Sequence, residues 1–202
     1  PGGNAVILRS IERVLFAVLD GRRAATMLEC IVSLIPSLAL GYCLRRKSIV
    51  LNETAYFGDG KIKGFKKVVI VGGGATPFTA IYWANIFCGP VVVLDKSRLA
   101  KVLSQRLVRR MGIKNIVVLN VEGENYDGYD CSIVSISLYA QNKDLILKRI
   151  LESKNENNNL IFLREFVGER THKLVHMWKV LGQTSEFCTL ILEPLARLPS
   201  NS

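Results

Sequence analysis

Histidine and paired cysteine are scarce in this chain, and their scarcity argues against a metalloprotein. The 202 residues include 2 histidines and 5 cysteines, and no two cysteines form a C-x-x-C pair. A zinc site usually combines four such ligands at close spacing, so we expect no metal site. Each cysteine lies in an apolar stretch, which indicates buried free thiols in a reducing compartment and hence a cytoplasmic protein.

Neither a membrane-spanning segment nor a signal peptide is recognisable in the sequence. The uncharged run over residues 30–44 is too short to cross a bilayer, because a spanning helix needs about 20 apolar residues, and Pro36 interrupts it. No segment has the charged, apolar and small-residue parts of a signal peptide. We therefore expect no membrane partner, and we leave a homodimer open.

Acidic residues are the minority charge. The sequence has 17 Asp and Glu against 27 Lys and Arg, which gives a net charge of +10. Such a charge favours anionic partners, so nucleic acid is an alternative partner. The basic residues are nevertheless spread over several segments and are not interleaved with aromatic residues, as a base-stacking surface requires. Most of this charge is therefore interpreted as solvated helix surface.

The most informative segment joins a buried strand to a glycine loop and a helix. Val68–Val71 is apolar throughout, and Gly72, Gly73 and Gly74 follow it directly. A second apolar strand ends in Asp95, 95 − 72 = 23 residues after the first glycine. Nucleoside-binding α/β folds place an acid about 20 residues beyond the loop, where it binds the ribose hydroxyls. The segment therefore predicts a nucleoside site, and a glycine turn without a ligand is the alternative.

The loop also favours one class of nucleoside. A dinucleotide site has the pattern G-x-G-x-x-G, but Pro77 stands at the third glycine position. Proline has no N–H to donate to a pyrophosphate, although it suits the first turn of a helix. S-adenosylmethionine has no phosphate and does not need that donor. We therefore expect S-adenosylmethionine as the co-substrate.

The chain divides into a small helical N-terminal region over residues 1–65 and an α/β region over residues 66–202. Helices are expected over 5–19 and 24–44, the second broken near Pro36, and the 49–56 segment is ambiguous. In the α/β region the strands are continuous apolar runs, typical of a parallel sheet covered on both faces. These strands are expected at 68–71, 91–95, 115–120, 131–137, 160–164 and 187–192. The helices between them are expected at 76–87, 97–111, 142–152 and 171–180.

This order of parts resembles the Rossmann-like class I S-adenosylmethionine-dependent methyltransferase fold. The resemblance implies that residues after the third strand contact the adenine, and that residues near the end of the fourth strand lie at the methionine end of the cofactor. The cofactor-binding residues that it implies are Gly72, Gly73, Gly74, Thr76, Pro77, Asp95, Lys96, Val121, Glu122, Ser135 and Ser137.

Three segments resemble the nicotianamine synthase family more closely, especially its archaeal members. Residues 71–80 (VGGGATPFTA) are similar to a G-G-G-P-L-P-L-T stretch of that family. Residues 164–170 (REFVGER) are similar to its R-x-x-x-G-x-R segment, and residues 52–55 (NETA) are similar to an N-E-A-A segment. The loop lacks the family's first proline and leucine. The resemblance covers roughly residues 52–192.

The resemblance implies transfer of the aminocarboxypropyl group of S-adenosylmethionine to a small amine or amino acid, with methylthioadenosine as the leaving product. Such chemistry needs a base for the amine proton and cationic groups for substrate carboxylates. Glu53 is the candidate base, Tyr56 or Tyr42 would position the amine, and Arg164 and Arg170 would hold carboxylates.

Other interpretations stay open at this stage. The two arginines could instead pair with Glu165 and Glu169, and the tyrosines could be ordinary half-buried residues. A methyltransferase acting on RNA or a small molecule fits the same fold, although the 135–139 segment (SISLY) lacks the Pro-Pro-Tyr motif of base N-methylation. A non-catalytic binding protein that keeps the fold is a third interpretation.

Overall fold

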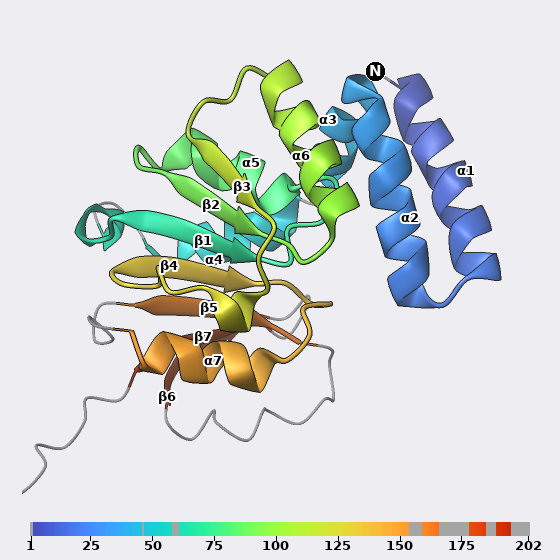
Figure 1. Ribbon diagram of the computed structural model, residues 1–202. Helices are drawn as coiled ribbons and strands as arrows, with labels where there is room; N and C mark the ends of the chain where they lie inside the picture. Colours follow the sequence, from blue (N-terminus) through green and yellow to red (C-terminus); the bar gives the residue numbers. More distant parts are fainter. Residues whose placement is uncertain are drawn as a thin grey trace, which may run out of the picture.

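A seven-stranded sheet forms the centre of the computed structural model of this chain (Figure 1). The structure describes residues 2–45, 47–57, 61–153, 159–165, 178–184 and 189–194. The strand order is β3-β2-β1-β4-β5-β7-β6. The strands are β1 (Lys67–Val71), β2 (Val91–Leu94), β3 (Ile116–Leu119), β4 (Ser132–Ile136), β5 (Leu160–Arg164), β6 (Trp178–Thr184) and β7 (Thr189–Pro194).

The first five strands run parallel, as the continuous apolar runs predict. β1 pairs with β2 on one side and with β4 on the other, and β3 and β5 extend the sheet outward. Every residue of β2, β4 and β5 is buried, because helices cover both faces of the sheet. All parallel strands therefore point their carboxyl ends to one edge, which is where ligands bind in open α/β sheets.

The end of the sheet differs from the prediction. β7 runs antiparallel to β5, and β6 pairs antiparallel with β7 in a hairpin. Residues 178–180 were expected at the end of a helix but lie in β6, while residues 171–177 lie outside the described residues. The local sequence has helical spacing, but the segment pairs with β7 as the edge strand of the sheet, and this tertiary contact overrides local propensity.

Four helices precede the sheet and confirm the predicted helical N-terminal region. They are α1 (Gly2–Val18), α2 (Gly21–Leu34), α3 (Pro36–Arg45) and α4 (Lys47–Ala55), and the short η1 (Lys61–Gly64) follows. Asp20 caps α2 by accepting hydrogen bonds from the backbone of Arg22 and Arg23. The break near Pro36 is confirmed, since Ile35 is extended between α2 and α3. The ambiguous 49–56 segment is mainly helical.

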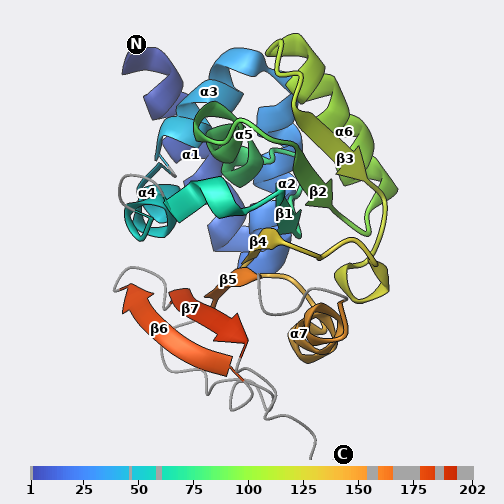
Figure 2. The ribbon, with the colours of Figure 1, turned by 90° about the vertical axis from the view of Figure 1, so that its left-hand side faces the viewer.

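Helices cover the two faces of the sheet unequally (Figure 2). One face packs against α5 (Phe78–Ile86), α6 (Arg98–Arg110) and the N-terminal helices in a single apolar cluster. The other face packs against α7 (Lys143–Leu151), near the short η2 (Gly123–Asn125). The N-terminal helices share their core with the sheet, and the predicted domain boundary at residue 65 stays a prediction. None of the described helices has the length and apolarity to span a membrane.

Candidate functional site

A pocket of about 300 Å³ lies at the carboxyl edge of the parallel strands. Its walls come from the loops that follow β1, β2, β3 and β4, and α2 of the N-terminal region closes it from the other side. This is the position at which the sequence predicts a nucleoside. The arrangement follows from the parallel sheet, because four consecutive loops meet at one edge.

The glycine loop is built so that other residues would not fit. Gly72 and Gly74 have φ angles of +77° and +67°, which side chains with a Cβ rarely adopt. A Cβ on Gly73 would overlap the Val93 side chain, and a Cβ on Gly74 would overlap the carboxylate of Glu29. The Ser137 hydroxyl donates a hydrogen bond to the Gly72 carbonyl over 2.9 Å. Gly72 and Gly74 therefore contribute bare main chain to the pocket wall.

Asp95 is fixed at the rim of the pocket by two backbone donors. Its Oδ2 accepts from the Gly74 N–H over 2.8 Å, and its Oδ1 accepts from the Ser97 N–H over 2.9 Å. A carboxylate offers about four acceptor positions, so capacity remains for two ribose hydroxyls. The predicted ribose contact is therefore compatible with the geometry.

The other predicted cofactor residues divide into two groups. Lys96, Val121, Glu122 and Ser137 line the pocket together with Gly72, Gly74 and Asp95. Gly73, Thr76, Pro77 and Ser135 are not among its lining residues. Thr76 is buried and donates to the Glu29 carbonyl over 2.9 Å, which ties the loop to α2. Ser135 is buried in β4 and donates to Glu53 over 3.1 Å.

Sequence reasoning missed Glu29. α2 lines the pocket with one stripe of its surface, at the helical spacing of Arg22, Thr26, Glu29 and Cys30. The Glu29 carboxylate lies against Gly74 and accepts a hydrogen bond from the Tyr42 hydroxyl over 3.4 Å. A lone acid before the uncharged 30–44 run was an available signal, but nothing local indicates that α2 reaches the glycine loop.

Among the described residues that line the pocket, acids outnumber bases. The acids are Glu29, Asp95, Glu122 and Glu124, and the bases are Arg22 and Lys96. This charge acts on Cys30, whose pKa is raised by burial and by the nearby Glu29 and Asp95 carboxylates. The electrostatics of the pocket therefore disfavour added negative charge and favour a cationic ligand.

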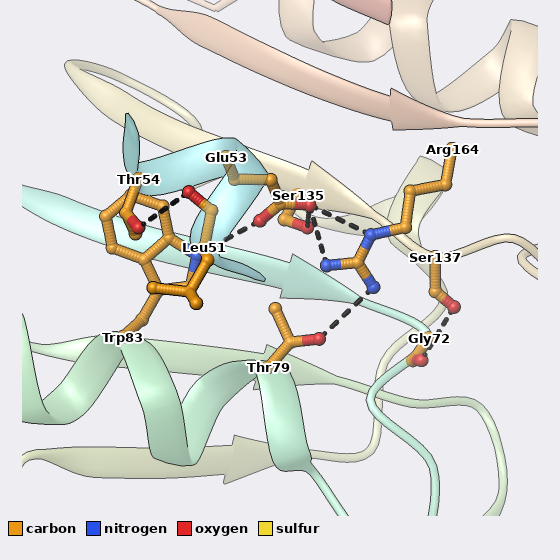
Figure 3. Close-up of polar contacts among 9 residues, drawn as sticks. All are labelled: Leu51, Glu53, Thr54, Gly72, Thr79, Trp83, Ser135, Ser137 and Arg164. Carbon is orange, nitrogen blue, oxygen red and sulfur yellow. Dashed lines mark hydrogen bonds and ion pairs between the residues drawn. The ribbon is translucent and has the colours of Figure 1, made fainter. Parts of the chain in front are cut away.

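A second polar cluster lies around Glu53, on the face of the sheet that α5 and the N-terminal helices cover (Figure 3). Its carboxylate is fully buried and accepts from Arg164 Nε over 2.9 Å and from Arg164 Nη2 over 2.6 Å. The Trp83 indole N–H donates to it over 3.2 Å, and Ser135 is the further donor. Arg164 Nη1 also donates to the Thr79 hydroxyl over 3.2 Å. Here the protein itself provides the counter-charge and the hydrogen bonds.

Two predicted catalytic residues thus lie together, but inside the protein. Neither Glu53 nor Arg164 is among the residues that line the pocket. Tyr56 is half-buried and packs edge-on against Phe57 and Phe162. Arg170 lies outside the described residues. The catalytic roles of these four residues remain predictions. No group of metal-ligating side chains occurs among the residues that the structure describes.

Comparison with known proteins identifies solved structures of the same fold. No protein-family model matches the sequence, and no curated protein sequence matches it significantly. A mutant of MtNAS, an archaeal nicotianamine synthase, is 14% identical with a TM-score of 0.74, over 97% of this chain and 78% of that one. MtNAS in complex with MTA and tNA is 15% identical with a TM-score of 0.74, over 94% and 76%.

A methyltransferase structure gives a similar result. The S-adenosylmethionine-dependent methyltransferase from Aquifex aeolicus is 14% identical with a TM-score of 0.59, over 80% of this chain and 99% of that one. Structural similarity at this level of sequence identity establishes the fold, and the activity must be inferred from the site. The chain has the Rossmann-like class I S-adenosylmethionine-dependent methyltransferase fold, preceded by N-terminal helices.

Proposed function

We propose that this chain binds S-adenosylmethionine in the pocket and transfers its aminocarboxypropyl group to an amine. The observation that carries this proposal is the Glu29 carboxylate, which lies against Gly74 at the glycine loop, on the same side of the molecule as Asp95. Two acids at one loop suit a ligand that joins ribose hydroxyls to a positive centre. S-adenosylmethionine has such a centre in its sulfonium sulfur.

The same observation argues against a dinucleotide. In dinucleotide-binding folds the pyrophosphate lies against the glycine loop at a helix N-terminus. The Glu29 carboxylate occupies the space next to Gly74, and four acids against two bases line the pocket. A pyrophosphate would bring further negative charge to this place, at an electrostatic cost.

Glu29 is also the group best situated to handle the acceptor's proton. The acceptor nitrogen attacks the carbon beside the sulfonium, the carbon–sulfur bond breaks, and methylthioadenosine leaves with the electron pair. The nitrogen then loses a proton, which the Glu29 carboxylate takes. Tyr42 holds the carboxylate by donating to it over 3.4 Å. We assign Glu53 a structural role, because four hydrogen bonds from Arg164, Trp83 and Ser135 occupy it.

The likeness to MtNAS supports aminocarboxypropyl transfer over methyl transfer. A mutant of that protein was solved in complex with S-adenosylmethionine, and MtNAS itself was solved with MTA and tNA. A methyltransferase would use the same pocket and the same contacts to the nucleoside, so the alternative must be separated by its product.

The test is the identity of the nucleoside product. The full chain is incubated with S-adenosylmethionine and a panel of amines and amino acids, and the nucleosides are measured by mass spectrometry. We expect methylthioadenosine in excess over an enzyme-free control. S-adenosylhomocysteine instead would support the methyltransferase, and calorimetry without detectable S-adenosylmethionine binding would contradict both.

A further inference from the structure

The segment from Lys96 to Val121 contains no acidic residue. It holds seven of the chain's 27 Lys and Arg and none of its 17 Asp and Glu. The seven are Lys96, Arg98, Lys101, Arg106, Arg109, Arg110 and Lys114. Since the net charge of the chain is +10, this one segment accounts for most of the excess. Its core is the helix α6.

These cations face solvent and are not neutralised by carboxylates. All seven except the half-buried Lys101 are exposed. Among the residues that the structure describes, no ion pair joins any of them to an acid. Lys96 bonds to the Gln141 side chain and Arg110 to the Leu34 carbonyl, and both of these partners are neutral.

Helix stability does not explain the pattern. Arg109 and Arg110 lie in the last turn of α6, where cations favour the helix dipole. Arg98 stands at the first position, where the dipole disfavours a cation, and the first turn has no acid. Arg106 and its neighbours three and four residues on are like charges on adjacent turns, which also disfavours the helix. These positive charges therefore destabilise the helix slightly, which indicates that they have a function other than helix stability.

The position of α6 connects this charge to the pocket. The pocket lining includes Lys96, Ser97, Leu99 and Ala100, so the N-terminal end of α6 forms part of its wall. The helix then runs for about 20 Å along β3, the strand at the edge of the sheet, with α2 beside it (Figures 1 and 2). Arg22 of α2 adds a further cation to the pocket wall.

We infer that the solvent face of α6 binds the phosphate backbone of a nucleic acid. Arginine pairs well with phosphate through two parallel N–H donors. Leu99 and Val102 are the exposed apolar side chains of α6, and both lie in its first half, while Leu107 and Val108 are buried. Arg106, Arg109 and Arg110 are therefore not accompanied by the continuous apolar stripe that a membrane surface needs. The helix has no aromatic residue for base stacking, so recognition runs through phosphates and has little sequence preference. This inference does not depend on the transfer chemistry.

Binding of fluorescently labelled 20-base-pair hairpins of RNA and of DNA, measured by anisotropy from 50 to 200 mM KCl, tests the inference. We expect affinity for at least one hairpin to fall steeply with salt. Arg98→Gln with Arg106→Gln should weaken binding about tenfold or more at 100 mM KCl. It should also lower the slope of log K against log salt by about 2, one unit for each lost phosphate contact. The RNA and DNA hairpins tell which nucleic acid is preferred.

The matched control removes the same charge elsewhere. Arg9→Gln with Arg13→Gln takes two exposed arginines from α1, which does not line the pocket. The affinity of this control should stay within twofold of that of the parent chain. Its slope of log K against log salt should stay within 0.5 unit. Equal losses in both double variants, or no binding to either hairpin at 50 mM KCl, would overturn the inference. So would tighter binding to vesicles of anionic phospholipid than to either hairpin.

Discussion

The pocket and the Glu53 cluster hold charged groups in opposite ways. In the cluster, each oxygen of the Glu53 carboxylate accepts from neighbouring side chains, and Arg164 supplies the balancing charge. Among the described residues that line the pocket, four acids stand against two bases. A buried carboxylate whose charge and hydrogen bonds are satisfied by the protein has no capacity left for a ligand. A pocket wall with an excess of carboxylates favours a cationic ligand. We therefore expect a structural role for Glu53 and a ligand-binding role for the carboxylates of the pocket.

The two regions are nevertheless in contact through aromatic residues. The Arg164 guanidinium lies 5.9 Å from the centre of the Phe78 ring, and Phe78 packs edge-on against Tyr42 at 5.9 Å. Tyr42 in turn donates to Glu29. The cluster is thus connected to Glu29 through Phe78, in the first turn of α5, and Tyr42.

Removing the Glu53 carboxylate should have the largest effect, and it should be on stability. Glu53→Ala leaves the Arg164 guanidinium buried without its counter-charge, which costs about 3–5 kcal/mol. Urea unfolding measures this loss. The double variant Glu53→Leu with Arg164→Met removes both charges and should recover most of it. A Glu53→Ala protein of near-parent stability that has lost its transfer activity would return Glu53 to the catalytic role.

Substitution of Glu29 should have the reverse effect, with a large loss of activity and a small change in stability. Glu29→Gln keeps the shape of the side chain but cannot accept a proton, so turnover should fall about 100- to 1,000-fold. The free energy of unfolding should change less than in Glu53→Ala, since the Gln amide oxygen can still accept the hydrogen bond from Tyr42. Steady-state kinetics and urea unfolding are measured together, with the exposed Glu152→Gln as the control. Unchanged turnover would remove Glu29 from the mechanism.

Asp95→Ala should weaken binding of S-adenosylmethionine by about 10- to 150-fold. The estimate corresponds to the loss of a hydrogen bond to a charged group, about 1.5–3 kcal/mol. Isothermal calorimetry measures the affinity, and Asp130→Ala, at a surface pair with Lys67 away from the pocket, is the control. A loss smaller than twofold would mean that the ribose lies elsewhere.

The smallest expected effect concerns Cys30 as a reporter of the pocket's charge. Burial and the carboxylates of Glu29 and Asp95 raise the pKa of its thiol, so the reactive thiolate is scarce at pH 8. Glu29→Gln removes one of these charges, lowers the pKa and should speed alkylation by iodoacetamide a few-fold. Peptide mass spectrometry separates this site from the exposed Cys88, whose rate should stay the same. An unchanged Cys30 rate would mean that the Glu29 charge does not reach it.

The sequence predicted the parts of this fold that depend on neighbouring residues. The strand, the glycine loop and the acid at residue 95 lie within 28 residues of one another, and each has a local pattern. The expected strand at 160–164 is confirmed residue for residue. The β6 strand was missed because its hairpin partner, and not its own pattern, determines its conformation.

The site was predicted less completely for the same reason. Glu29 faces a loop that begins 43 residues later, and no local pattern indicates how α2 docks. Glu53 and Arg164 are 111 residues apart, so sequence reasoning found two charged residues of opposite sign without a way to pair them. Long-range packing of α2 and α4 on the sheet decided both outcomes.

The hydrogen bond from Thr76 to the Glu29 carbonyl has a consequence for how the ligand is gained. One wall of the pocket is α2, so the binding site is complete in those molecules in which α2 is docked on the glycine loop. The apparent dissociation constant then equals the intrinsic constant divided by the docked fraction. Substitutions in the α2 interface therefore weaken the apparent affinity without contacting the ligand, because they lower the fraction of molecules in which α2 is docked.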